Sequence, residues 1–308
     1  MMKRRMAPIL MVATLAAAPS PRERIIAGDG IVDVMIAGRP ARLRVDPAAP
    51  AMPLIDRGLA DRAGLKMTGR WGVGIGYSIG GTGVMSRTQV VRVDLGNGPA
   101  KRRVGWTARP FAAVADGSVG PDAFAEPVVR FRLRPALPGE RESVFRATRD
   151  SALFGLFGNF SATFAEIEVG GEPMRVRFDP YHPRTLATAG AAMRLAGLHD
   201  GVVSGAAAPT EIFFGIERPV RTLTLRRPLT LGPLAISTLG VRTQDDGNAT
   251  GLREADAPPP DPDEIVVTGK GRKRDLRHDV LSLGADYLSR CSSIVFDTPA
   301  NRIRLSCR

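Results

Sequence analysis

The chain has 308 residues, of which 44% are hydrophobic, so it can bury one large core or two ordinary ones and wholesale disorder is excluded. Lysine and arginine outnumber aspartate and glutamate by 43 to 31, which gives a formal net charge of +12. Aromatic residues make up only 6%, and no nucleic-acid-binding motif is present. Stacking surfaces for single-stranded nucleic acid are therefore not expected, and neither is a nucleic-acid partner.

Many of the arginines alternate with apolar residues, as in residues 42–45, 130–133, 175–178 and 302–305. Alternation with a period of two predicts strands that carry arginine on one face and apolar side chains on the other. We interpret the arginine faces as solvated sheet surfaces. A patch for an acidic polymer or an anionic membrane surface is the alternative.

The first residues have the pattern of an export signal, which is predicted over residues 1–18. Lys3, Arg4 and Arg5 form a basic start, and the apolar stretch from Ala7 to Ala18 is too short to span a bilayer. No other stretch of the sequence is long enough for a transmembrane helix. We therefore expect an exported protein, periplasmic or secreted, without stable membrane insertion.

In the first half of the chain, short alternating runs and glycine-containing turns predict strands. Residues 31–45 are predicted to form a hairpin around Gly38 that ends at Asp46. Residues 54–65 have the apolar spacing of a helix. The glycine-rich stretch 72–83 lacks the Gly-Lys-Ser/Thr of a phosphate loop and is predicted to be a β-hairpin with a glycine tip. Further strands are predicted over residues 90–95, 101–106 and 128–133.

The second half of the chain repeats this plan. A predicted hairpin over residues 164–178 ends at Asp179, and a helix is predicted over residues 186–198. Residues 244–278 are predicted to be a flexible insertion, because they begin with a stretch rich in Asp, Gly and Pro. Strands are predicted over residues 211–216, 220–225 and 229–239.

Matched landmarks in the two halves indicate an internal duplication. Residues 38–47 match residues 171–180, so that Asp46 corresponds to Asp179, and the Gly-Leu ends of the two predicted helices have the same separation. Residues 119–124 match the stretch that begins at Leu283, with a longer separation that corresponds to the insertion. Each half is therefore expected to be a small β-rich lobe with one aspartate at a matching place.

The two cysteines, Cys291 and Cys307, flank a predicted hairpin. Residues 294–305 contain two alternating runs around a Pro-Ala-Asn turn, and the cysteines lie at similar distances from that turn. A cross-strand disulfide is therefore expected in an oxidising compartment. A pair of unlinked thiols is the alternative.

Taken together, these elements resemble the retroviral-type and pepsin-like aspartic proteases, in the two-lobed single-chain form found in bacteria. The resemblance is carried by the two hairpins that end in aspartate, the helices that end in Gly-Leu, and the closing stretch Leu281–Leu288 with the hairpin after it. It implies a mainly β fold of two homologous β-barrel lobes with short helices. The lobes are expected over residues 25–135 and 163–308, with a connection over residues 136–162.

By matching position, the resemblance implies that Asp46 and Asp179 are the catalytic pair. Two carboxylates held close together cannot both ionise, so they share one proton, and one acts as a base on water while the other acts as an acid toward the scissile carbonyl. In the family a Thr or Ser and then a Gly follow each aspartate, and the hydroxyl braces the two loops. Here Pro-Ala and Pro-Tyr follow instead, so the hydroxyl and the glycine are missing from both halves.

Three functional hypotheses follow from the sequence. The first is an aspartic-type endopeptidase with altered loops, and the second is a non-catalytic relative that binds extended peptide and in which the aspartates are structural turn residues. The third is an envelope interaction protein that uses the basic strands or residues 264–274, because Glu264–Gly269 resembles the TonB box of outer-membrane receptors. A flap-like strand or a plain linker is the alternative for that segment.

No cofactor is expected, and the protein is expected to be a monomer that acts on a peptide or protein. His182 follows Asp179 closely, but the three histidines (His182, His199 and His278) do not have the spacing of metal ligands. His182 is therefore interpreted as a loop residue.

Overall fold

The computed structural model of the chain describes residues 22–66, 73–149, 161–245, 247, 249–257 and 275–308. The predicted export signal and the segment Glu264–Gly269 lie outside these residues. The described part is mainly β, as predicted, with three short α-helices. No helix within the described ranges is long and apolar enough to cross a membrane.

Seven strands and helix α1 (Arg57–Arg62) form the first half of the molecule. The strands are hydrogen-bonded in the order β2-β3-β8-β4-β7-β6-β5, and an additional pairing of β2 with β6 closes six of them into a barrel. Their bounds are β2 Ile31–Ile36, β3 Arg39–Val45, β4 Leu54–Asp56, β5 Val73–Ile79, β6 Thr82–Asp94, β7 Pro99–Thr107 and β8 Gly117–Val119.

The second half has seven strands in the corresponding order, β11-β12-β17-β13-β16-β15-β14. Corresponding neighbours also run in the same relative directions: β3–β8 and β12–β17 are parallel, as are β4–β7 and β13–β16, and the other neighbours are antiparallel. Helix α2 (Ala189–His199) follows β13 as α1 follows β4. The bounds are β11 Thr163–Val169, β12 Glu172–Phe178, β13 Leu186–Ala187, β14 Gly201–Phe213, β15 Ile216–Leu231, β16 Leu234–Arg242 and β17 Val280–Leu283.

An ion pair occupies the same place in each half. Arg62 at the end of α1 lies 3.0 Å from Asp116, just before β8, and Arg194 in α2 lies 3.0 Å from Asp279, just before β17. The second pair is the more buried, with Asp279 only 1% exposed. Each pair fixes the helix against the segment that leads into the central strand of its half.

The second half does not close into a barrel as the sequence analysis expects. Among the described strands, β11 pairs with β12 and with β10 (Arg141–Arg149), and no pairing of β11 with β15 is present. In the first half the corresponding edge of β2 is available and pairs with β6. The strand β10, which belongs to the predicted connection, therefore occupies the edge that a second barrel would need.

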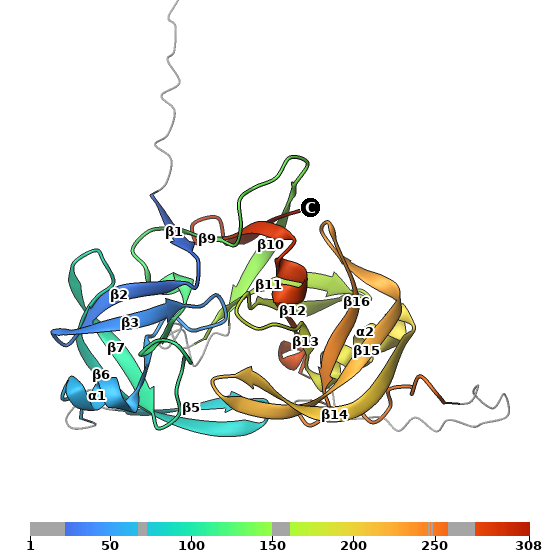
Figure 1. Ribbon diagram of the computed structural model, residues 1–308, viewed down its shortest axis with the longest axis horizontal. Coiled ribbons are helices and arrows are strands. Elements are labelled where there is room, and N and C mark those ends of the chain that lie inside the picture. The colour runs from blue at the N-terminus through green and yellow to red at the C-terminus, as the bar shows by residue number, and fades with distance from the viewer. Residues whose placement is uncertain (1–21, 67–72, 150–160, 246, 248, 258–274) are drawn as a thin grey trace, which may run out of the picture.

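A shared set of strands joins the halves. The order β1-β9-β18-β19-β10 continues through β11 into the second half, so that these strands and the second half make one 12-stranded sheet. The bounds are β1 Glu23–Ala27, β9 Val128–Arg132, β18 Cys291–Asp297 and β19 Arg302–Cys307. In Figure 1 the first half lies on the left and the second on the right, with the shared strands toward the top.

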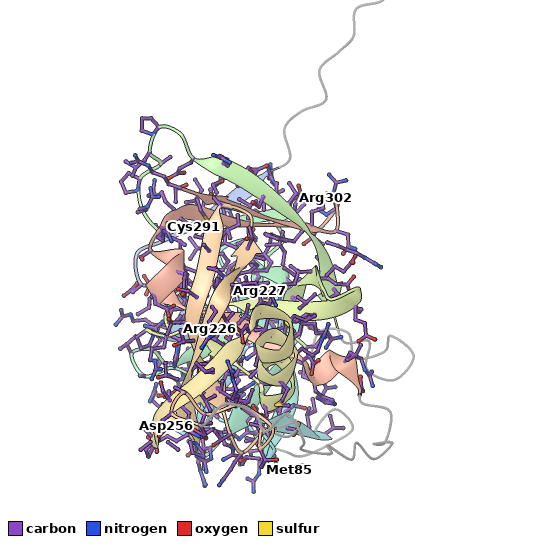
Figure 2. The ribbon with its side chains drawn as sticks, turned by 90° about the vertical axis from the view of Figure 1, so that its right-hand side faces the viewer. Met85, Arg226, Arg227, Asp256, Cys291 and Arg302 are labelled. Carbon is purple, nitrogen blue, oxygen red and sulfur yellow. A yellow bond between two sulfur atoms is a disulfide. The ribbon has the colours of Figure 1, made fainter. Side chains whose placement is uncertain are left out.

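The strands β18 and β19 form the predicted hairpin, and Cys291 and Cys307 are joined by the predicted disulfide, with an S–S distance of 2.04 Å. Both cysteines are fully buried. In the side view of Figure 2, Cys291 lies toward the upper end of the molecule and Met85, on β6, lies at the lower end. The disulfide and the β5–β6 hairpin therefore lie at opposite ends.

Several predicted boundaries are wrong. Residues 54–65 begin as strand β4, because Leu54 and Ile55 pair with β7 and β8, and the helix starts only after Asp56, whose carboxylate accepts from the backbone N of Leu59 (2.6 Å). Likewise β13 precedes α2. The predicted strand over residues 229–239 is a hairpin of β15 and β16. Part of the insertion is ordered, since Glu254 pairs with Arg221.

The short helices complete the described structure. Helix α3 (Ala285–Leu288) follows β17, and the 3-10 turn η1 (Pro121–Ala123) follows β8. The turn η4 (Leu276–His278) precedes β17. The stretches after β8 and β17 are those that the sequence analysis matched to each other.

Candidate active site

Asp46 and Asp179 occupy corresponding positions at the ends of β3 and β12. The backbone N of Asp46 donates to the carbonyl of Val119 at the end of β8 (2.9 Å), and the backbone N of Asp179 donates to the carbonyl of Leu283 at the end of β17 (2.9 Å). Both aspartates are buried, with exposed fractions of 9% and 7%. Each aspartate therefore lies at the end of a pair of parallel strands, Asp46 beside β3 and β8 and Asp179 beside β12 and β17.

The two aspartates line one cavity of about 450 Å³. Its walls come from both halves: the ends of β3 and β12, the segment after β7, and the tip of the β14–β15 hairpin. The lining residues are Arg44, Asp46, Pro110, Phe111, Ala112, Ala113, Asp179, Tyr181, His182, Pro183, Thr210, Glu211, Ile212, Phe213, Phe214 and Gly215. The structure thus brings the two candidate catalytic residues to one cavity.

Burial dominates the electrostatics of the pair. Burial, together with the nearby charge of Asp179, raises the pKa of Asp46 from 3.8 to about 7. Burial likewise raises the pKa of Asp179, against the opposing effects of His182 and Arg177. At neutral and acidic pH the site therefore favours at least one protonated carboxyl.

One arginine precedes each aspartate by two residues. Arg44 and Arg177 both lower the pKa of Asp46, although burial outweighs them. The Arg44 guanidinium lies over the Tyr181 ring (4.7 Å), and that of Arg177 lies over the Phe213 ring (4.9 Å). These two cations make the surroundings of the carboxylates less negative than an isolated pair of aspartates would be.

The prolines after the aspartates change how each carboxylate is held. Because a proline has no N–H, the first donor after Asp46 is the backbone N of Ala48, which donates to Oδ1 (2.7 Å). In the second loop the backbone N of His182 donates to Oδ1 of Asp179 (3.2 Å). Each carboxylate is therefore fixed by its own loop in a local turn.

Tyr181 supplies a cross-half hydrogen bond that the sequence analysis missed. Its hydroxyl donates to the carbonyl of Val45, the residue before Asp46, at 3.2 Å. Gly30 makes room for it, because a Cβ at Gly30 would overlap the Tyr181 hydroxyl. The Thr or Ser hydroxyl of the family is missing from both halves, but in the second half another hydroxyl makes a contact between the loops. The hydroxyl comes from the second residue after the aspartate and not the first.

His182 is more than a loop residue. Its Nε2 lies 2.8 Å from the carbonyl of Glu211 on β14, and its Nδ1 lies 2.5 Å from the carbonyl of Arg184. The imidazole therefore ties the Asp179 loop to the hairpin that covers the cavity. Among the described residues, no three His, Cys, Asp or Glu side chains are grouped to hold a metal ion.

The β14–β15 hairpin, whose tip lines the cavity, contacts the β5–β6 hairpin of the first half. The Nε of Arg218 on β15 donates to the carbonyl of Gly80 at the β5–β6 turn (2.5 Å), and its guanidinium also contacts the Thr82 hydroxyl. Apolar side chains of both hairpins pack in one buried cluster, which contains Val84, Ile212, Ile216 and Val220. Figure 1 shows β5 and β14 approaching each other at the bottom of the view. The hairpin of the first half therefore holds the β14–β15 hairpin, whose tip lines the cavity.

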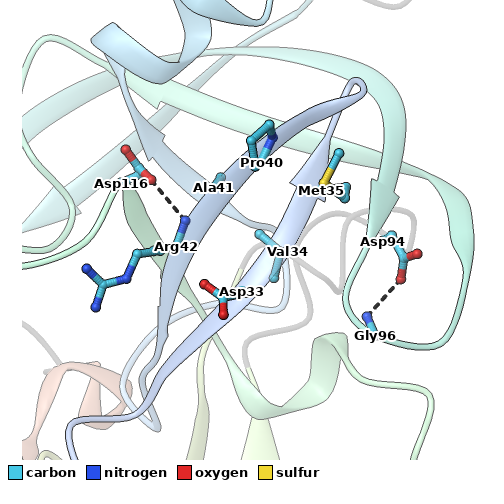
Figure 3. A pocket seen from close by; sticks show the side chains of 9 residues that line it. All are labelled: Asp33, Val34, Met35, Pro40, Ala41, Arg42, Asp94, Gly96 and Asp116. Atoms are coloured by element: carbon cyan, nitrogen blue, oxygen red, sulfur yellow. Dashed lines mark hydrogen bonds between the residues drawn. The ribbon is translucent and has the colours of Figure 1, made fainter.

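A second cavity, of about 580 Å³, lies beside the β2–β3 hairpin (Figure 3). Two of its three carboxylates have local partners: Asp116 accepts from the backbone N of Arg42 (2.9 Å), and Asp94 accepts from that of Gly96 (2.8 Å). They hold backbone segments in place and lie on the first half alone. This cavity therefore lacks a pair of carboxylates that come from corresponding positions in the two halves.

Comparison with known proteins gives no functional assignment. No protein family model matches the chain, and no curated protein matches it. The function must therefore be inferred from the fold and from the geometry around Asp46 and Asp179.

Proposed function

We propose that the chain is an aspartic-type endopeptidase with two homologous lobes, in which Asp46 and Asp179 are the catalytic pair. One observation carries the proposal: two buried carboxylates, one from each half and at corresponding places in the strand order, line the same cavity. The equal order and direction of seven strands in each half support a duplicated lobe. The β14–β15 hairpin at the wall of the cavity supports an extended peptide as the substrate.

The raised pKa values of both carboxyls support a shared-proton mechanism. The ionised member takes a proton from water as the water attacks the scissile carbonyl, and the protonated member donates its proton to the carbonyl oxygen. The newly protonated carboxyl then donates its proton to the amide nitrogen as the C–N bond breaks, and the other carboxylate takes a proton from a hydroxyl of the gem-diol. The products are a carboxylic acid and an amine, and the pair again holds one proton. Activity is expected to fall as pH rises above about 7, where Asp46 loses its proton.

We also propose that the protein acts outside the cytoplasm. The disulfide between Cys291 and Cys307 supports an oxidising compartment, periplasmic or extracellular. This agrees with the export signal predicted over residues 1–18.

The second candidate is a non-catalytic peptide-binding relative. The specific observation in its favour is the pair Arg44 and Arg177, which oppose the proton that the mechanism needs. The prolines after both aspartates favour it too, because they remove an N–H from each loop.

Cleavage of a mixed peptide library by the full chain, from acidic to neutral pH, separates the two candidates. Under the endopeptidase proposal, Asp46→Asn and Asp179→Asn each abolish cleavage, whereas Asp33→Asn in the second cavity leaves it unchanged. A pepstatin-type inhibitor should suppress cleavage as well. A folded protein that cleaves nothing at any pH contradicts the endopeptidase proposal and leaves the binding candidate. Cleavage that survives both substitutions contradicts the assignment of Asp46 and Asp179 as the catalytic pair, and it also contradicts the non-catalytic candidate.

The envelope-partner hypothesis for residues 264–274 stays a prediction, because the segment lies outside the described residues. Deleting residues 258–274 is the appropriate test, since a longer deletion would remove Glu254 and its pair with Arg221. Capture of an envelope partner should be lost while thermal unfolding is unchanged. Capture that persists after the deletion would refute the hypothesis.

A further inference from the structure

The tips of the β5–β6 and β14–β15 hairpins have the same backbone but different residues. Each is a two-residue turn in which both residues have positive φ: Gly80 (+54°) and Gly81 (+75°) in the first half, Phe214 (+52°) and Gly215 (+68°) in the second. Glycine, asparagine and aspartate are the usual residues of such turns. Phe214 therefore has a backbone conformation that a residue with a bulky side chain rarely adopts. The β5–β6 hairpin forms the same turn with two glycines, so the turn does not require a phenylalanine.

The Phe214 side chain packs on the first half. It is only 8% exposed although it lies at a hairpin tip, and it belongs to a buried cluster with Met52, Leu54 and Phe111. Its ring meets that of Phe111 edge-on, with 4.8 Å between centroids. The turn with the unfavourable backbone conformation is therefore the one whose tip residue makes contacts with the other half.

This contact lies at the candidate active site. Phe111 and Phe214 line the same cavity as Asp46 and Asp179. Arg218, on the strand after the turn, holds the opposing hairpin through Gly80. A peptide that approaches the aspartates from this side must displace the Phe214 tip.

We propose that Phe214 is an internal occupant that blocks the cleft, and that the apolar pocket of Met52, Leu54 and Phe111 receives an aromatic side chain of the peptide when the hairpin withdraws. The chemistry of the ligand follows from its present occupant, a phenyl ring set edge-on against Phe111. The proposal rests on the peptide-binding function proposed above. It requires binding and not hydrolysis.

Phe214→Gly is the test variant, because it gives the second hairpin the Gly-Gly turn that the first already has. The probes are two octapeptides with a reduced, uncleavable central bond, one with phenylalanine beside that bond and one with glycine. The variant should bind the phenylalanine peptide at least about tenfold more tightly than the wild type, because the occupied state no longer competes. The glycine peptide should gain less.

Ala37→Gly is the matched control, since Ala37 has φ +49° in the β2–β3 turn away from the cavity. It relieves a turn of the same kind and should leave both affinities unchanged. Amide hydrogen exchange gives a second readout without a ligand. Exchange at Gly81, Thr82 and Ile216 should become faster in Phe214→Gly and not in Ala37→Gly.

Equal affinity of wild type and Phe214→Gly for the phenylalanine peptide, or an equal gain for both peptides, overturns the proposal. Its failure is distinct from failure of the endopeptidase function. If the wild type cleaves peptides and Phe214→Gly has no effect, the internal-occupant proposal is wrong and the peptidase proposal stands. If the variant binds more tightly but no cleavage occurs, the internal-occupant proposal stands and the peptidase proposal is wrong.

Discussion

At the scale of single residues, the carboxyl of Asp46 makes the stability of the fold depend on pH. Its pKa is 3.8 in the unfolded chain and about 7 in the folded one, so between these values the folded state binds more protons. Stability is therefore highest below 3.8 as far as this group is concerned, and it falls as pH rises to about 7. The loss is about 4 kcal/mol at most.

Urea unfolding over this pH range checks the prediction with Asp46→Asn. The amide does not titrate, so the free energy of unfolding of the variant should decline less steeply with pH than that of the wild type. Asp33→Asn serves as the control, with the wild-type slope. The same steep decline in Asp46→Asn would show that another group is responsible.

The hydroxyl of Tyr181 is expected to stabilise the junction of the halves. Tyr181→Phe removes the hydrogen bond to Val45 and should cost on the order of 1 kcal/mol, measured by urea unfolding. Tyr77→Phe is the matched control, because among the described residues the buried Tyr77 hydroxyl has no hydrogen-bond partner. That change should be neutral or slightly stabilising. Equal losses in both variants would argue against the cross-half role.

The sequence identifies the aspartates but not their surroundings. Asp46 and Asp179 are visible because the motif around them repeats. Arg44 and Arg177 repeat with them, although their alternation with apolar residues indicates only strands with arginine on one face. Tyr181 is not visible in this way, because its partner is a backbone carbonyl in the other half. Phe111 and Phe214 lie far apart in the chain and meet only through the fold.

At the scale of elements, Gly284 marks a close approach at the end of β17. A Cβ there would overlap the backbone of Arg184, so Gly284→Ala should destabilise the protein by about 2 kcal/mol. Gly197→Ala in α2 is the control, since a Cβ there meets nothing within 4 Å, and it should stabilise by up to about 1 kcal/mol. Thermal unfolding of both variants checks the prediction. Tolerance of alanine at residue 284 would mean that the approach relaxes readily.

The local sequence pattern predicts a secondary-structure element correctly where residues close in the chain determine its structure. The β2–β3, β5–β6 and β18–β19 hairpins follow from alternation and turn residues, and the structure has them. The start of α1 is different. Leu54 and Ile55 have helical spacing, but they pair with β7 and β8, which lie about fifty to sixty residues further along. Such distant partners override local preference.

At the scale of the whole molecule, the disulfide stabilises the sheet that the halves share. It closes a loop with a sequence separation of 16, so replacing both Cys291 and Cys307 with serine should cost roughly 3 kcal/mol. Guanidinium unfolding of the variant and of the reduced wild type should give the same lower midpoint. An unchanged midpoint in both would mean that the bond does not constrain the unfolded chain.

The strand order of the whole molecule is only partly accessible from the sequence. The repeat indicates two similar halves, and the structure has two sets of seven strands in corresponding order. Barrel closure in one half alone does not follow from the repeat, because it depends on β10. That strand lies between the halves in sequence and pairs with both β19 and β11.

The position of the β18–β19 hairpin has a consequence for synthesis of the chain. The hairpin lies between β9 and β10, which are made about 150 residues earlier. While the ribosome is still working, β9 and β10 therefore have exposed edges with unpaired backbone groups. The shared sheet is completed only after the last strands emerge, so a nascent chain halted before Cys291 should aggregate or recruit a chaperone where the released chain does not.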